Sequence, residues 1–134
     1  MNRTFVPFRS RPDAPLDPAL LRRALGPHAP PTLAPDSPHQ ALPGGGAVTV
    51  EPGGQVEISS APTASLTVLH DAVDGDMARL VGLLDTAGLR LGEAGIDAHR
   101  PPRRLLDTPR YAAMQRAFDA LKSLPTDIDP INER

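Results

Sequence analysis

The stretch that most restricts the fold of this chain is VTVEPGGQVEIS, residues 48–59. Apolar and polar residues alternate on both sides of a Pro-Gly-Gly turn, which is the pattern of a β-hairpin with one buried face. We expect strands at 47–51 and 55–60. A three-residue turn would place Val50 opposite Val56 and Thr49 opposite Glu57, and residues directly opposed share a face of the sheet.

This pairing predicts one valine-rich face that packs against helices and one polar face. The polar face would carry Thr49, Glu51, Gln55 and Glu57, with Ser59 beyond them. Its simplest interpretation is exposure to water, because antiparallel sheets commonly have one solvated face. Alternatively, two carboxylates and an amide oxygen are the hard ligands that Mg²⁺ takes, together with the phosphates of a nucleotide. The spacing alone leaves both interpretations open.

Helical signals flank the hairpin. Asp17, Pro18 and Gly26 are a cap, a first-turn proline and a stop, so we expect a helix at 18–25. A long helix is predicted after the hairpin and should end near Gly88. A second clear helix should start after Thr108, with a buried side formed by Tyr111, Met114, Phe118 and Leu121.

Strand signals outside the hairpin are weaker. Residues 4–8 suggest a short strand that Pro7 confines to a sheet edge. Residues 89–97 could add another strand. The order strand, helix, hairpin, helix, strand, helix predicts the α+β class, with an antiparallel sheet and packed helices.

Composition limits the core and the number of domains. The 134 residues include 17 prolines and 11 glycines, and only 3% are aromatic. Leu, Val, Ile and Ala must therefore form a thin core. We expect one domain over 1–126, with a flexible Pro/Gly-rich loop at 27–46 and a tail at 127–134.

Charge and composition also exclude several functions. A net charge of −2 is not the basic balance of a nucleic-acid-binding protein. No apolar run is long enough for a membrane helix or a signal peptide. The absence of cysteine excludes a thiol nucleophile and a disulfide framework. We therefore expect a cytoplasmic protein that binds neither nucleic acid nor membrane.

Longer motifs carry a family resemblance. EPGGQVEIS is followed by a long helix and then by GLRLGEAGIDAHRPPRRLLDTPRYAAM. The order of these segments resembles the bacterial and plant type of glutamate–cysteine ligase, and within it the actinobacterial enzymes that make γ-glutamylcysteine for ergothioneine. The resemblance covers roughly residues 15–120.

The resemblance implies a fold, a reaction and a set of site residues. The fold would be part of the glutamine-synthetase-like ligase fold, in which a curved antiparallel sheet binds metal, ATP and glutamate on its polar face. The reaction would phosphorylate the γ-carboxylate of glutamate, after which the amine of cysteine displaces phosphate. By motif, Glu51 and Glu57 would be Mg²⁺ ligands, and Gln55, Arg110 and Tyr111 would contact substrate.

Other residues in these motifs have competing interpretations. Arg100, Arg103 and Arg104 would approach phosphate or would simply form a solvated loop. Arg110 alone would be read as an exposed first-turn residue, and Met114 as a core residue.

The sequence also departs from the family pattern. The resemblance implies a Glu-x-Glu strand near the position of Asn2 and Arg3, further strands after the last helix, and a proline where Ala98 stands. Three hypotheses follow: a ligase or a piece that works with a complementary chain; a non-catalytic remnant or small binding module; and a ligase that uses another amine. Self-association through exposed sheet edges is a further expectation.

Overall fold

The computed structural model describes residues 1–123 except 9–10, 12, 93 and 102, and the predicted tail at 127–134 lies outside the described residues. The elements in chain order are β1 (Asn2–Phe5), β2 (Pro7–Phe8), α1 (Pro18–Leu25), a 3₁₀ turn (Gly26–His28), β3 (Ala47–Val50), β4 (Val56–Ser59), α2 (Leu66–Thr86), β5 (Arg90–Leu91) and α3 (Pro109–Lys122). The predicted α+β class is confirmed.

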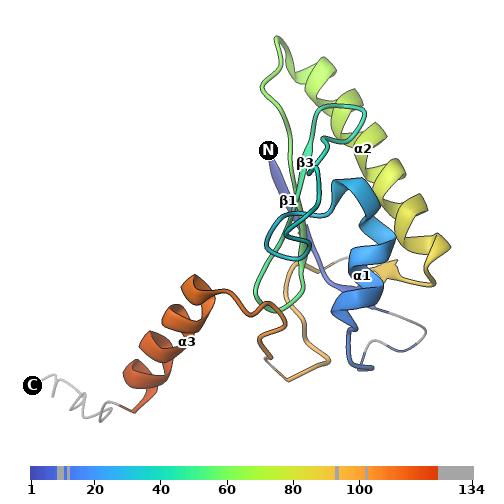
Figure 1. The fold of residues 1–134 in the computed structure, drawn as a ribbon. Helices are drawn as coiled ribbons and strands as arrows, with labels where there is room; N and C mark the ends of the chain where they lie inside the picture. Colours follow the sequence, from blue (N-terminus) through green and yellow to red (C-terminus); the bar gives the residue numbers. More distant parts are fainter. Residues whose placement is uncertain (9–10, 12, 93, 102, 124–134) are drawn as a thin grey trace, which may run out of the picture.

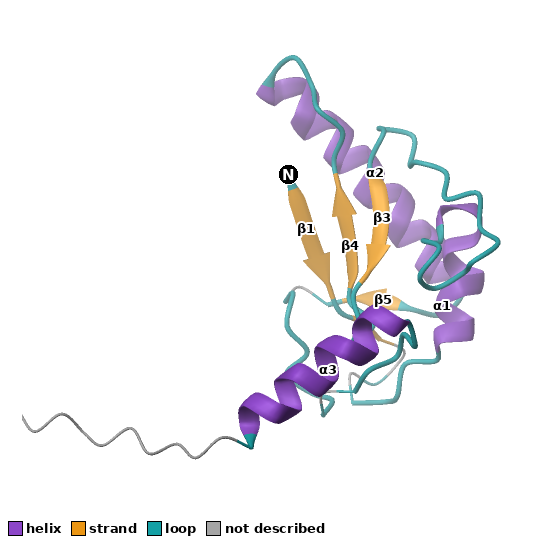
Figure 2. Ribbon diagram, turned by 60° about the vertical axis from the view of Figure 1, so that its left-hand side comes forward, coloured by secondary structure: helices purple, strands orange, loops and turns teal. Residues whose placement is uncertain are grey.

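The main sheet is antiparallel, with strand order β1-β4-β3 (Figure 2). Val50 pairs with Val56 and Thr49 pairs with Glu57, which is the predicted register. Each hairpin strand is slightly shorter than expected. The backbone N–H of Glu51 still donates to the carbonyl of Gln55 at 2.8 Å, so the hairpin closes as predicted.

The sequence analysis missed how the first residues enter the sheet. Residues 4–8 are not one strand: β1 pairs along β4, and β2 leaves the sheet to pair with β5. The strand predicted at 89–97 is limited to Arg90–Leu91. Because β1 covers the open side of β4, Glu57 lies on the central strand of the sheet.

Two helices pack against the valine-rich face and form the core. Asp17 caps α1, accepting from the backbone N–H of Ala19 at 2.9 Å, and Ser65 caps α2. The largest fully buried aliphatic side chains are Leu21, Leu25, Val48, Val50, Val56, Ile58, Leu80, Leu84 and Leu89. Figures 1 and 2 show α2 lying along one face of the sheet, beside α1. The opposite face of the sheet is thereby left for polar residues.

The segment 27–46 is a loop, as predicted, but it packs closely against the core. Ala29, Ala34 and Leu42 are buried in the main hydrophobic cluster. The Nδ1 atom of His28 lies 2.8 Å from the carbonyl oxygen of Gln40, which connects the start of the loop to its second half. The alternative of a detached linker is therefore wrong, and the flexibility of the loop stays a prediction.

Helix α3 forms where predicted but does not bury the predicted side. The hydroxyl of Thr108 accepts from the backbone N–H of Tyr111, so the predicted cap is confirmed. Tyr111 is partly buried against the core, whereas Met114, Phe118 and Leu121 are 39%, 55% and 61% exposed. The prediction of Met114 as a core residue is wrong, because α3 extends away from the rest of the molecule (Figure 1).

Candidate functional site

The polar face of the sheet centres on Glu57. Its carboxylate accepts hydrogen bonds from the hydroxyls of Thr4 on β1 and Ser59 on β4, each at 3.3 Å. Thr49 lies directly opposite on β3. Glu57 is only partly exposed, and these two hydrogen bonds fix the orientation of its carboxylate.

Three buried polar atoms at or near this face have no hydrogen-bond partner among the described residues. They are Oγ1 of Thr49, Oε1 of Gln55 and Nη1 of Arg100. Buried polar groups in proteins are nearly always paired, so unpaired ones call for an explanation such as a bound ligand. Thr49 lies on β3 opposite Glu57, and Gln55 lies in the turn just before β4. The polar face thus has more hydrogen-bonding capacity than its own side chains use.

The carboxylate oxygens of this face suit Mg²⁺ only if phosphate and water oxygens supply the remaining ligands. Glu51 is exposed at the end of β3, diagonal to Glu57, and diagonal neighbours in a sheet are about 7–8 Å apart. Within the described part of the chain, no three His, Cys, Asp or Glu side chains form a metal-binding group. An all-protein cage is therefore not formed by these residues. Mg²⁺ typically binds through one or two carboxylates together with phosphates and water, and the residues present suit that mode.

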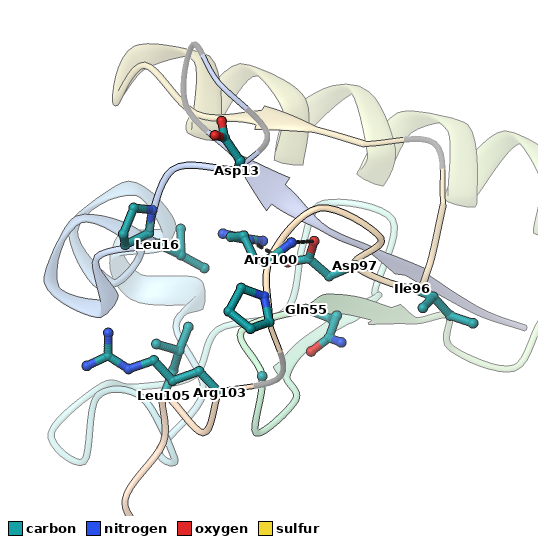
Figure 3. A pocket seen from close by; sticks show the side chains of 11 residues that line it. Asp13, Leu16, Gln55, Ile96, Asp97, Arg100, Arg103 and Leu105 are labelled. Carbon is teal, nitrogen blue, oxygen red and sulfur yellow. Dashed lines mark hydrogen bonds and ion pairs between the residues drawn. The ribbon is translucent and has the colours of Figure 1, made fainter.

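A cavity of about 280 Å³ lies next to the polar face, at the turn end of the hairpin (Figure 3). Gln55 belongs to both the face and the cavity. A partly buried ion pair between Arg100 and Asp97 lines it, with side chains 10% and 18% exposed. Arg100 also donates from Nη2 to the carbonyl of Pro7 at 3.0 Å, which attaches the cavity loop to β2.

The charge state of Asp97 follows from its surroundings. Burial alone would raise the pKa of its carboxyl group. The backbone N–H groups of Arg100 and His99, both at 3.0 Å, and the Arg100 guanidinium outweigh burial, so the pKa of Asp97 lies below its usual value. At neutral pH this cavity therefore contains a fully ionised pair.

The remaining predicted site residues are dispersed. Arg103 is exposed at the mouth of the cavity, and Arg104 pairs with Asp107 at 3.2 Å. Arg110 is exposed on the first turn of α3, and beside it Tyr111 packs against the core. The structure brings Gln55 and Glu57 together on one face, whereas within the described part of the chain Arg110 and Tyr111 form no side-chain hydrogen bond or ion pair with them. The roles of Glu51, Glu57, Gln55, Arg110 and Tyr111 stay predictions.

Sequence reasoning missed the pairing of Arg100 with Asp97. The sequence groups Arg100 with Arg103 and Arg104, yet an aspartate three residues before Arg100 was the available signal for a pair. In the structure a tight turn lets the carboxylate of Asp97 accept from the backbone of Arg100 as well as from its side chain. The basic cluster thus consists of one partly buried ion pair, Arg100 with Asp97, and two exposed arginines.

The fold and these groups define an α+β chain whose antiparallel sheet carries helices on one face and oxygen ligands on the other. A family model described as glutamate-cysteine ligase family 2 (GCS2) matches residues 19–127. This is more than half of the chain, and the chain belongs to that family.

Curated relatives agree with this assignment. Glutamate–cysteine ligase EgtA of Mycobacterium tuberculosis (strain CDC 1551 / Oshkosh) is 43% identical over 82 residues, which is 61% of this chain and 19% of the relative. EgtA of Mycolicibacterium smegmatis is 40% identical over 79 residues, which is 59% of this chain and 19% of the relative. The chain thus spans about a fifth of the length of these relatives. No solved structure matches.

One further observation concerns membranes. Among the helices within the described residues, none combines the length and apolar character that crossing a membrane requires.

Proposed function

We propose that this chain takes part in the ATP-dependent ligation of the γ-carboxylate of glutamate to cysteine, giving γ-glutamylcysteine for ergothioneine or a related thiol. The chain would supply one part of the site. The observation that carries the proposal is the polar sheet face around Glu57, with its unpaired buried oxygen on Thr49, in a member of the glutamate–cysteine ligase family. A metal–nucleotide site on one face of an antiparallel sheet also agrees with the glutamine-synthetase-like fold that the family resemblance implies.

Glu57 and Glu51 would hold Mg²⁺ on this face. These two carboxylates would hold the metal beside the bound nucleotide, and the chemistry supplied there would be positive charge that offsets the negative charge of a phosphoryl transfer. The hydroxyls of Thr4 and Ser59 orient the carboxylate of Glu57. The Glu57 side chain would therefore lose little conformational entropy when it binds the metal. A carboxylate pre-oriented in this way binds a cation with less entropic cost than a free one.

Gln55, Arg110 and Tyr111 would contact substrate. Gln55 is the best placed of the three, because its unpaired Oε1 can accept from an ammonium or N–H group next to Glu57. Arg110 is exposed and free to approach a carboxylate or phosphate, for which the planar guanidinium fork is suited. Tyr111 would act mainly by fixing the first turn of α3 against the core.

The experiment measures Mg²⁺-dependent binding of ATP to the purified chain, with and without a chelator. We expect Glu57→Gln to weaken Mg²⁺-dependent ATP binding at least tenfold, because the amide keeps the shape of the side chain but removes its charge. Asp71→Asn changes an exposed carboxylate on α2 and serves as the charge-matched control. Equal ATP binding by the wild-type chain and Glu57→Gln would refute the proposed metal site.

A second candidate function is a small binding module of the same family without ligase activity. It is favoured by the exposed apolar side of α3, which the described residues leave uncovered. An assay for γ-glutamylcysteine with glutamate, cysteine and MgATP separates the two. Product that disappears in Glu57→Gln supports the ligase, and absence of both product and Mg²⁺-dependent ATP binding supports the module.

A further inference from the structure

Exposed apolar side chains gather at two opposite ends of the molecule. One group lies on α3 and includes Phe118 and Leu121. The other lies on the first turn of α2, where Leu66 and Val68 are 83% and 53% exposed. Contiguous exposed apolar surface on a protein commonly marks a site of contact with another protein. The start of α2 and α3 lie far apart at opposite ends of the chain's fold, so the two groups cannot meet within one molecule (Figures 1 and 2).

The α3 group borders a groove with a basic rim. The groove has a volume of about 560 Å³ and lies between α3 and the turn of the hairpin, with apolar walls that include Pro52, Phe118 and Leu121. Arg103 and Lys122 also line it, and neither forms an ion pair with a described residue. No carboxylate is among the described residues that line the groove. The groove therefore presents apolar surface framed by positive charge.

The α2 group has acidic side chains beside it instead. Asp71 and Asp74 are exposed on the following turns of the helix. Asp74 lies 3.2 Å from the Nδ1 atom of His70, whereas Asp71 forms no ion pair with a described residue. The sequence contains no lysine or arginine between residues 61 and 78. This surface is therefore apolar like the groove and opposite to it in charge.

We propose that the groove beside α3 binds the outer side of the first turns of α2 in a second copy of this chain. The apolar side chains of the two surfaces would pack together, and Lys122 and Arg103 would lie near the Asp71 carboxylate of the other copy. Because every copy carries both surfaces, the contact is head to tail, and such contacts build rings or open chains of copies. A symmetric contact between two α3 helices is disfavoured, because it would bring two basic rims together.

Sedimentation velocity of the purified chain tests this contact, at protein concentrations from about 10 μM to about 1 mM, where weak association becomes populated. We expect a monomer at the low end of this range and a sedimentation coefficient that rises with concentration. Added salt should reverse the rise, because it screens the charges of the two surfaces. A sedimentation coefficient that stays constant over the whole range would overturn the proposal.

Two double variants, each altering one surface at exposed positions, test the head-to-tail arrangement. Phe118→Ser, Leu121→Gln alters the groove, and Leu66→Ser, Val68→Ser alters the α2 surface, so each variant alone should stay monomeric. An equimolar mixture should form a 1:1 dimer that grows no further, because each variant retains the surface that the other lacks. Association by either variant alone would overturn the proposal in favour of a symmetric contact through the retained surface. A mixture that stays monomeric would overturn it outright.

Matched charge reversals test the rims. Lys122→Glu and Asp71→Lys should each weaken association at least tenfold. Arg116→Glu changes an exposed arginine of α3 outside the groove, and Asp85→Lys changes an exposed aspartate near the end of α2, so both controls should associate like the wild-type chain. Equal losses in the controls would overturn the proposal in favour of a general effect of net charge. Glu57→Gln should also associate normally, so this proposal and the proposed metal site fail independently.

Discussion

A single buried carboxylate shows how much one residue contributes to this fold. Asp76 on α2 is 1% exposed and accepts from the backbone N–H groups of Gly44 at 2.6 Å and Gly46 at 2.8 Å. A Cβ atom at Gly46 would stand 2.5 Å from the Asp76 carboxylate, so the loop needs glycine to approach it. These hydrogen bonds connect the loop just before β3 to α2 and thereby fix the position of the sheet relative to the helix.

We predict that Asp76→Ala lowers the free energy of unfolding by about 1–3 kcal/mol for each donor that it leaves buried and unpaired. Urea denaturation followed by circular dichroism measures the change. Asp71→Ala, at an exposed position of the same helix, should change stability by less than about 0.5 kcal/mol. Equal stability of the two variants would mean that water replaces the carboxylate without loss.

At the scale of elements, α3 differs from α1 and α2. Like them it has a side-chain N-cap and apolar residues at helical spacing, yet no described residue of α3 is fully buried. We predict that the double variant Phe118→Ser, Leu121→Gln changes the free energy of unfolding by less than about 0.5 kcal/mol and reduces the binding of a hydrophobic dye. Leu84→Ala, in the core on α2, should instead cost about 2–5 kcal/mol.

Comparison of the α3 double variant with Leu84→Ala tests the α3 prediction directly. A loss of stability in the α3 variant comparable to that of Leu84→Ala would show that the apolar side of α3 is packed in solution. A change in sedimentation between the wild-type chain and the α3 variant would then identify self-association as the cause.

At the scale of the whole molecule, the Asp97–Arg100 pair links the cavity loop to β2 through the carbonyl of Pro7. The folded-state pKa of Asp97 is lower than its unfolded value of about 3.9. The carboxylate therefore contributes stability at pH values above about 4, and this contribution is lost as the pH falls through the folded-state pKa. We predict that the free energy of unfolding decreases on acidification below about pH 4.

The check compares urea denaturation of the wild-type chain and of Asp97→Asn as a function of pH. The variant should be less stable at pH 7 and should lose less stability on acidification, because its side chain does not titrate. Parallel pH profiles for the two proteins would show that Asp97 does not contribute to the acid sensitivity of the fold.

The hairpin, α1 and the cap of α3 could be predicted because their signals are local. Alternation of period two places Val48 and Val56 on one face and Glu57 on the other whatever the rest of the chain does. The entry of β1 beside β4 could not be predicted, because a pairing over more than fifty residues leaves no local pattern. The exposure of Met114 and Phe118 was missed for a related reason: apolar spacing shows which side of a helix is apolar, but not whether another element covers it.

The α+β class, the hairpin register, the polar face that contains Glu57 and, through its motifs, the glutamate–cysteine ligase family all follow from the sequence alone. Each of these depends on residues close together in the chain or on their order. Three features became visible only in the folded chain: Asp76 binds the glycine loop, Arg100 pairs with Asp97, and Gln55 lies both on the polar face and in the cavity. These features depend on where distant segments meet, because burial and ion pairing are set by packing rather than by sequence spacing.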